Sequence, residues 1–125
     1  MTPETVLLRQ VHPNFVQGNR VSSQVFRPTP KDKDLLSVYD GDMIDPKPAW
    51  VHFNSQSNCK SVGVMGVTVA ECAELDLPSR PDPEPFPEHA VIDFSSYSKG
   101  QIEKKAKHLC NKADGRGWLY QDVAQ

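Results

Sequence analysis

The alternation of apolar and polar residues predicts short strands along most of the chain. Such patterns occur at positions 5–11, 21–27, 35–39, 62–71 and 89–94, and the valine-rich segment 62–71 is long enough for a central strand. In the first of them, residues 7, 9 and 11 share one face and residues 6, 8, 10 and 12 share the other. Together these segments would build most of one sheet.

A single apolar stripe predicts a long helix near the C-terminus. Ser98 and Gln101 have the spacing of a capping box, and Tyr97 with Ile102 fits the accompanying hydrophobic staple. The stripe recurs at i, i+4, i+7, i+8 and i+11, which selects Ile102, Ala106, Leu109, Cys110 and Ala113. A glycine at position 115 or 117 ends the helix, and residues 118–120 return as an edge strand.

A second, shorter helix is predicted in the middle of the chain. Asp45 is typical of an N-cap and Pro46 of the first helical position, so the helix runs from there to about Phe53. Strands dominate and do not alternate regularly with helices. We therefore predict an α+β fold with an antiparallel or mixed sheet of about five to six strands, and with one long C-terminal helix and one short helix packed on it.

A proline-rich, acidic segment interrupts this pattern at positions 74–88. Five of the 11 prolines of the chain lie there, at positions 78, 81, 83, 85 and 87, together with five acidic residues and one arginine. Prolines at every second position favour an extended, polyproline-like path. The segment is either a linker between two domains or a strap across one. The flanking pieces are small for two cores, so we predict a single domain, 1–125, with a strap at 74–88.

Length, composition and cysteine count set limits on location and class. The chain has 125 residues and a net charge of −2, and none of its apolar runs reaches the ~18 residues that a membrane span needs. Its first residues lack the basic segment of a secretory signal. Three cysteines without a C-x-x-C pair suggest reduced thiols. We expect a cytoplasmic protein without membrane contact, disulfide framework or cofactor.

Four polar signatures in the first 42 residues mark strand ends where side chains can converge. They are Arg9–Pro13, Ser22-Ser23, Arg27–Asp32 and Ser37–Asp42. The proline and Asp-Gly parts are also typical of ordinary turns. The strand end at Arg9 has no such alternative explanation, so it is the most informative of the four.

Candidate catalytic residues lie at two strand ends. Arg9 could stabilise an anion beside His12, and His89 shares a strand face with Asp93, which could orient its imidazole. Histidines that only make structural hydrogen bonds are the alternative. Ser23 and Tyr39 are candidate ligand-binding residues. No metal site is expected, because the histidines and cysteines have no ligand spacing such as H-x-x-x-H.

Two further patterns bear on function. The order Arg9, Ser22-Ser23, Glu71 and Glu74 is similar to that of ADP-ribosyltransferases, a likeness that implies a nicotinamide-dinucleotide site gripped by an aromatic such as Tyr39 or Phe26. Two residues separate the glutamates where that family has one, and the chain is not assigned to it. The basic residues at 99–116 could bind phosphate or an acidic partner, but are more typical of a solvated helix face.

Two functional hypotheses remain. In the first, the chain is a small interaction or accessory domain that binds a protein partner through Trp50, Pro83 and Phe86 and has no catalysis of its own. In the second, it is a small enzyme or ligand-binding protein for a phosphate-containing substrate, a nucleotide or RNA, with an Arg/His cluster as its site. The second requires Arg9, His12 and His89 to lie within about 8 Å of one another around a pocket.

Overall fold

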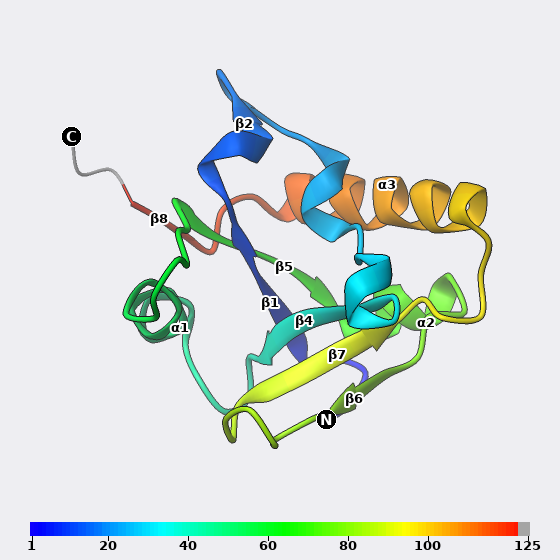
Figure 1. The fold of residues 1–125 in the computed structure, drawn as a ribbon, viewed down its shortest axis with the longest axis horizontal. Coiled ribbons are helices and arrows are strands. Elements are labelled where there is room, and N and C mark those ends of the chain that lie inside the picture. Colours follow the sequence, from blue (N-terminus) through cyan, green and yellow to red (C-terminus); the bar gives the residue numbers. More distant parts are fainter. Residues whose placement is uncertain (123–125) are drawn as a thin grey trace.

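Six antiparallel strands form the main sheet of the computed structural model, which describes residues 1–122 (Figure 1). Their order is β6-β7-β4-β1-β5-β8, and the α+β prediction is confirmed. The strands are β1 (Val6–Val11), β4 (Leu35–Asp40), β5 (Gly63–Thr68), β6 (Ser79–Pro81), β7 (His89–Asp93) and β8 (Tyr120–Gln121). A separate hairpin contains β2 (Val16–Gln17) and β3 (Arg20–Val21).

Three α-helices and three 3₁₀ turns complete the fold. The α-helices are α1 (Pro46–Asn54), α2 (Val69–Glu74) and α3 (Lys99–Arg116); the 3₁₀ turns are η1 (Pro13–Phe15), η2 (Ser23–Phe26) and η3 (Pro30–Asp32). No helix within residues 1–122 combines the length and apolar character needed to cross a bilayer.

Both predicted helices form where their end signals place them. Asp45 and Pro46 begin α1, and the Ser98–Gln101 capping box begins α3 with both reciprocal hydrogen bonds, at 3.3 and 2.9 Å. All five residues of the predicted stripe in α3 are buried. Gly117 ends the helix with φ of 88°, a conformation that glycine adopts without strain.

The sheet has an apolar cluster on each face. The larger cluster lies between the sheet, α3 and η2, and it includes Leu7, Val11, Phe26, Phe94 and Leu109. The smaller cluster lies between the sheet and α1. Its buried members are Leu8, Tyr39, Ala49 and Val64, against which Trp50, Phe53 and Phe86 pack. The chain can fill both faces because side chains alternate along β1 and β4.

Two predicted strands are corrected by local capping. The strand predicted at 21–27 is wrong beyond Val21, because the Ser22 hydroxyl accepts a hydrogen bond from the Gln24 N–H at 3.2 Å and begins η2. The strand predicted at 62–71 ends at Thr68, which forms a capping box with Glu71 and begins α2. In both cases a side-chain hydrogen bond to the backbone overrides an apolar run.

The proline-rich segment runs along the sheet edge and then under α1. Its residues Ser79–Pro81 form the edge strand β6 beside β7, a place where proline costs no ladder hydrogen bond. Beyond β6, the Asp82 N–H donates to the His89 carbonyl and the His89 N–H donates to the Phe86 carbonyl. These two bonds close a loop that brings Phe86 against the smaller apolar cluster.

Candidate functional site

The main sheet opens between its two central strands. Strands β1 and β4 pair only at Leu7–Asp40 and Leu8–Tyr39, although β1 continues to Val11 and β4 begins at Leu35. The next pairs in this register would be Arg9 with Val38 and Gln10 with Ser37. Neither pair forms, so the strands diverge and a gap opens in the middle of the sheet.

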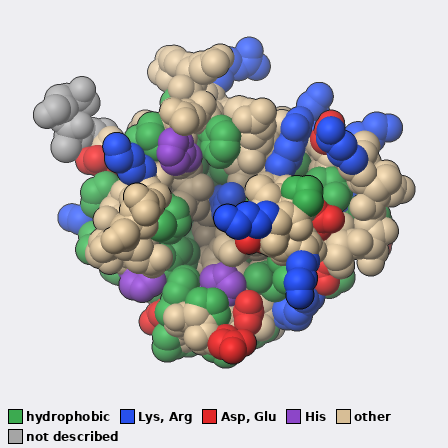
Figure 2. Space-filling model, viewed as in Figure 1, with side chains coloured by type: hydrophobic (Ala, Val, Ile, Leu, Met, Phe, Trp, Pro, Cys, Tyr) green, Lys and Arg blue, Asp and Glu red, His purple; other side chains and the backbone are tan. Residues whose placement is uncertain are grey.

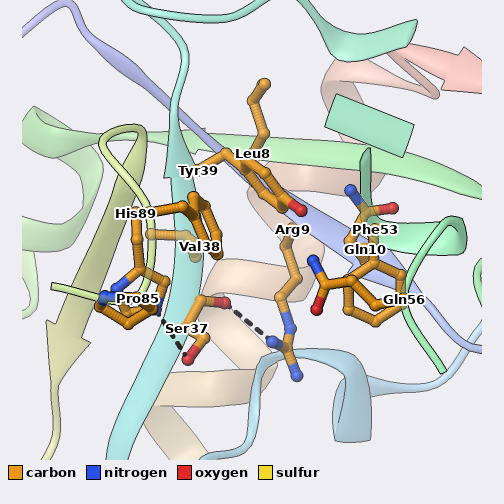
Figure 3. A pocket seen from close by; sticks show the side chains of 11 residues that line it. Leu8, Arg9, Gln10, Ser37, Val38, Tyr39, Phe53, Gln56, Pro85 and His89 are labelled. Carbon is orange, nitrogen blue, oxygen red and sulfur yellow. Dashed lines mark hydrogen bonds between the residues drawn. The ribbon is translucent and has the colours of Figure 1, made fainter. Parts of the chain in front are cut away.

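The side chain of Arg9 occupies this gap. Its Nη1 donates to the Ser37 carbonyl at 2.8 Å and its Nε donates to the Val25 carbonyl of η2 at 2.7 Å (Figure 3). Burial lowers the pKa of Arg9 from 12.5 to about 10, and the charge of Asp32 only partly offsets this. No carboxylate of the described residues lies within ion-pair distance of the Arg9 guanidinium. The hydrogen-bond acceptors of this partly buried cation are thus two neutral carbonyls, and Asp32 lines the small pocket beside it beyond ion-pair distance.

A cavity of about 310 Å³ lies over the gap, on the α1 face of the sheet. Figure 3 shows Arg9, Gln10 and Ser37 on its floor beside His89 and Tyr39. Apolar side chains form the rest of the lining: Leu8, Val38, Phe53, Pro85 and Phe86. The space-filling view shows a hollow near the centre of the same side of the molecule, with basic and histidine side chains at its edge (Figure 2).

Two polar atoms next to Arg9 are buried without a hydrogen-bond partner. They are Gln10 Oε1, whose residue lines the cavity, and Arg27 Nε, whose residue lines a small adjoining pocket of about 60 Å³ together with Arg9 and Ser37. Gln10 is 8 % exposed and uses its amide nitrogen to donate to the Ala49 carbonyl of α1 at 3.1 Å. Among residues 1–122 no other buried side-chain atom lacks a partner. Unpartnered buried polar atoms are costly, so both suggest a place for a ligand.

A chain of hydrogen bonds links the cavity floor to the proline-rich segment. His89 Nε2 lies 3.1 Å from Ser37 Oγ, and His89 Nδ1 lies 2.8 Å from the Asp82 carbonyl and 3.4 Å from the Asp82 carboxylate. The pairing of β4 with β7 fixes this arrangement, because it sets His89 opposite Tyr39 and diagonal to Ser37 on one face. His89 itself is buried.

Aromatic rings close one side of the cavity. The Phe86 ring lies 5.0 Å from Tyr39, 4.7 Å from His52 and 5.2 Å from His89, measured between ring centroids. The Tyr39 hydroxyl is 2.8 Å from His52 Nδ1. Burial, and then the nearby charges of Cys59 and Glu88, raise the pKa of Tyr39 above its ordinary value. Tyr39 therefore stays protonated, and its ring packs against Phe86 to form one wall of the cavity.

The cavity brings together some of the residues predicted from the sequence. Arg9, His89 and Tyr39 line it. His12 does not: its Nδ1 accepts from the Asn14 N–H at 3.0 Å and begins η1. The cluster of Arg9, His12 and His89 that the second hypothesis required therefore does not form around this cavity, and only Arg9 and His89 meet there. Asp93 lies at the other end of β7, about 13 Å along the strand from His89.

The neighbours of Asp93 and Ser23 also separate them from the cavity. Asp93 binds Ser95 and pairs with Arg80 at 2.9 Å; the Ser95 hydrogen bonds, and then Arg80, lower its pKa. Ser23 lies in η2 and does not line the cavity. The glutamate of the ADP-ribosyltransferase-like order, Glu71, pairs with Arg116 at 3.0 Å. None of these side chains reaches the cavity floor.

Sequence reasoning missed Gln10 and Ser37 as site residues and Asp82 as their neighbour. Gln10 is a polar residue that follows Val6 and Leu8 on one face of β1, and this is the one sequence signal that could have identified it. Ser37 lies in a recognised polar signature but resembles any strand serine. Asp82 contributes its backbone carbonyl, which accepts from His89. Every residue has a backbone carbonyl, so the residue type gives no signal for this role.

The residues predicted to bind a partner are mostly engaged within the chain. Trp50 Nε1 donates to the Ser61 carbonyl at 2.8 Å and its ring lies 5.2 Å from that of Tyr120. Phe86 packs in the aromatic wall of the cavity, whereas Pro83 is exposed. Within the described part of the chain, no group of three His, Cys, Asp or Glu residues is placed to hold a metal ion.

Comparisons with models of protein families, with curated proteins and with solved structures found no match to this chain. The proposal below therefore rests on the cavity and its lining residues.

Proposed function

We propose that the protein binds a small ligand carrying an anionic, phosphate-type group and a flat apolar group, in the cavity over the gap between β1 and β4. The observation that carries this proposal is Arg9: a desolvated guanidinium whose two bonded acceptors are neutral carbonyls. A half-buried charge that its nearby carboxylate, Asp32, offsets only in part is unfavourable, and an anion supplied by a ligand would reduce that penalty.

The size of the penalty follows from the pKa of Arg9. A decrease from 12.5 to about 10 corresponds to about 3 kcal/mol favouring the neutral form. An anion beside the guanidinium would recover part of this energy. Arginine is well suited to the task, because its planar fork can donate two hydrogen bonds to one phosphate or carboxylate group.

The remaining lining indicates the rest of the ligand. Gln10 Oε1 lacks a donor, so a ligand N–H or O–H would satisfy it. Phe86, Tyr39 and Phe53 offer apolar surface to a flat group. The volume of about 310 Å³ is at the lower end for small-molecule sites and fits a ligand of mononucleotide size.

The protein-partner hypothesis stays a prediction, and its test is separate. Replacing residues 82–88 of the proline-rich segment by a Gly/Ser linker and comparing captures from the native host would show whether a specific partner is lost. Because Trp50 and Phe86 pack within the chain, the geometry favours the ligand-binding proposal over this one.

The test uses phenylphosphonate, whose C–P bond resists cleavage, in a titration followed by ¹H–¹⁵N NMR. Methylphosphonate and benzyl alcohol, each carrying half of the probe, are the controls. We expect saturable shifts at amides around Arg9, Ser37 and Phe86, with tighter binding of phenylphosphonate than of either control. Equal binding of benzyl alcohol and phenylphosphonate, or shifts confined to other surfaces, would refute the proposal.

A further inference from the structure

The hydrogen bond of His89 to the Asp82 carbonyl determines whether Ser37 is the donor or the acceptor in the bond between Ser37 and His89. The Asp82 carbonyl can only accept, so His89 Nδ1 carries the proton of the 2.8 Å bond. In a neutral imidazole the other nitrogen then holds a lone pair. The hydroxyl of Ser37 must therefore donate to His89 Nε2 across 3.1 Å. A serine that donates to an oriented histidine has the polarity of an activated nucleophile.

Ser37 is open to a ligand, whereas its base is sheltered. Ser37 is exposed and lines both the main cavity and the small adjoining pocket. His89 is 8 % exposed, so its ring is held in place by the sheet and the Phe86 wall. Figure 3 shows Ser37 between His89 and Arg9, bonded to both through different atoms.

Arg9 adds a fixed positive charge beside this pair. Its Nη1 holds the backbone carbonyl of Ser37 itself, so the guanidinium cannot move away without breaking that bond. It is also the only lysine or arginine that lines the main cavity, counted over the described residues. One cation next to a nucleophile matches a reacting group that bears a single negative charge, and a phosphodiester is such a group.

We infer that Ser37 is a catalytic nucleophile toward phosphodiesters, with His89 as its general base and Arg9 as the group that stabilises charge on the phosphorus oxygens. The inference rests on the proposed anion-binding function of the same cavity. Asp82 is a positioning residue, because its carbonyl orients His89 without reaching the substrate.

The reaction balances with water as the only co-reactant. Ser37 Oγ attacks phosphorus, its proton moves to His89 Nε2, and the bond from phosphorus to one alcohol oxygen breaks. His89 returns the proton to that leaving oxygen, which departs as an alcohol. Water, deprotonated by His89, then attacks the seryl phosphodiester, and Ser37 leaves with the proton. The products are one alcohol and one phosphate monoester.

A fluorophosphonate probe tests the nucleophile, since it traps activated serines at phosphorus. We expect one adduct per chain, mapped to Ser37 by peptide mass spectrometry. Ser37→Ala should abolish it, and His89→Gln should slow it about a hundredfold, the usual contribution of a general base. The control Ser96→Ala, in the exposed loop before α3, should label like wild type. No adduct in wild type, or an adduct on another residue, would overturn the inference.

Substrate class is tested with bis(4-nitrophenyl) phosphate against 4-nitrophenyl acetate. Release of 4-nitrophenolate from the phosphodiester, lost in Ser37→Ala, supports the inference; release from the acetate alone overturns it. Ser37→Ala should still bind phenylphosphonate, because Arg9 bonds to the backbone of residue 37. If wild type binds phenylphosphonate but neither labels nor cleaves, this inference fails and the proposed function stands. Ser37→Ala removes the hydroxyl that bonds to His89, but residue 37 is exposed and its backbone carbonyl stays bonded to Arg9, so the variant should fold normally.

The role of Asp82 has its own test. Asp82→Asn keeps the backbone carbonyl that accepts from His89, so the plateau labelling rate at high pH should match wild type. A plateau rate lowered about as much as in His89→Gln would overturn the assignment of the orienting role to that carbonyl.

Discussion

Replacing Gln10 by methionine should leave the ligand-free protein equally stable or more stable. In wild type, Gln10 Oε1 is buried without a donor, which costs about 1–3 kcal/mol. Gln10→Met removes that cost and keeps the length of the side chain. It also loses the bond from the Gln10 amide to the Ala49 carbonyl, worth about 0.5–1.5 kcal/mol. That carbonyl lies within α1 and keeps its helical hydrogen bond.

The difference between these two contributions is an unfolding free energy about 1 kcal/mol higher than that of wild type, within a range from about 0.5 kcal/mol lower to about 2.5 kcal/mol higher. Urea titration followed by circular dichroism measures it as a shift of the midpoint at constant slope. Gln56→Met, an exposed glutamine at the same cavity, is the control and should change stability by less than about 0.5 kcal/mol.

The same variant should bind phenylphosphonate no more tightly than wild type, so stability and binding move independently. A loss of more than about 1 kcal/mol on Gln10→Met, beyond the change in Gln56→Met, would show that Oε1 already has a partner. The reasoning that this residue is kept for a ligand would then be wrong.

Two other predictions concern the fold. Burial raises the pKa of the Cys72 thiol from 9.0 to about 12, so between these pH values the thiol ionises in the unfolded chain but not in the folded one. The contribution of the protonated thiol to folding stability is therefore complete below pH 9 and is lost between pH 9 and 12. Under reducing conditions wild type should lose about 1.4 kcal/mol more than Cys72→Ala between pH 8 and 10, and parallel losses would contradict this. Gly41→Ala places a Cβ 2.3 Å from the Val6 carbonyl oxygen and should destabilise the fold by about 2 kcal/mol or more. In Gly100→Ala the new Cβ meets nothing within 4 Å, so this control should be neutral or stabilising. The melting temperatures of the two variants test this difference.

Most of the architecture can be predicted from the sequence, because its signals are local. The capping box at Ser98, the stripe in α3 and the Asp45-Pro46 start of α1 each act within one or two turns of helix. The sequence pattern fails where a side chain competes for the backbone. Ser22 and Thr68 end apolar runs that would otherwise read as strands, and their hydrogen bonds could not be inferred from hydrophobicity.

The candidate site is only partly predictable, because it depends on a sheet register. The sequence indicates Arg9 and His89 separately, but their approach follows from β4 lying between β1 and β7. The β1–β4 pairing ends early, which opens the gap that Arg9 fills. No residue type in either strand predicts this early end of the pairing. Conversely, the period-2 rule correctly places His89 and Asp93 on one face, yet the length of β7 separates them.

The central claim is that Arg9 binds an anionic ligand, and isothermal titration of phenylphosphonate tests it most directly. The comparison is between wild type, Arg9→Gln and the charge-matched control Arg20→Gln, which removes one exposed positive charge in the β2–β3 hairpin. We expect the dissociation constant of Arg9→Gln to be at least tenfold larger than that of wild type, which is a loss of about 1.4 kcal/mol of binding free energy. For Arg20→Gln we expect less than a twofold change. Equal affinities for all three proteins, each shown to be folded, would contradict the claim.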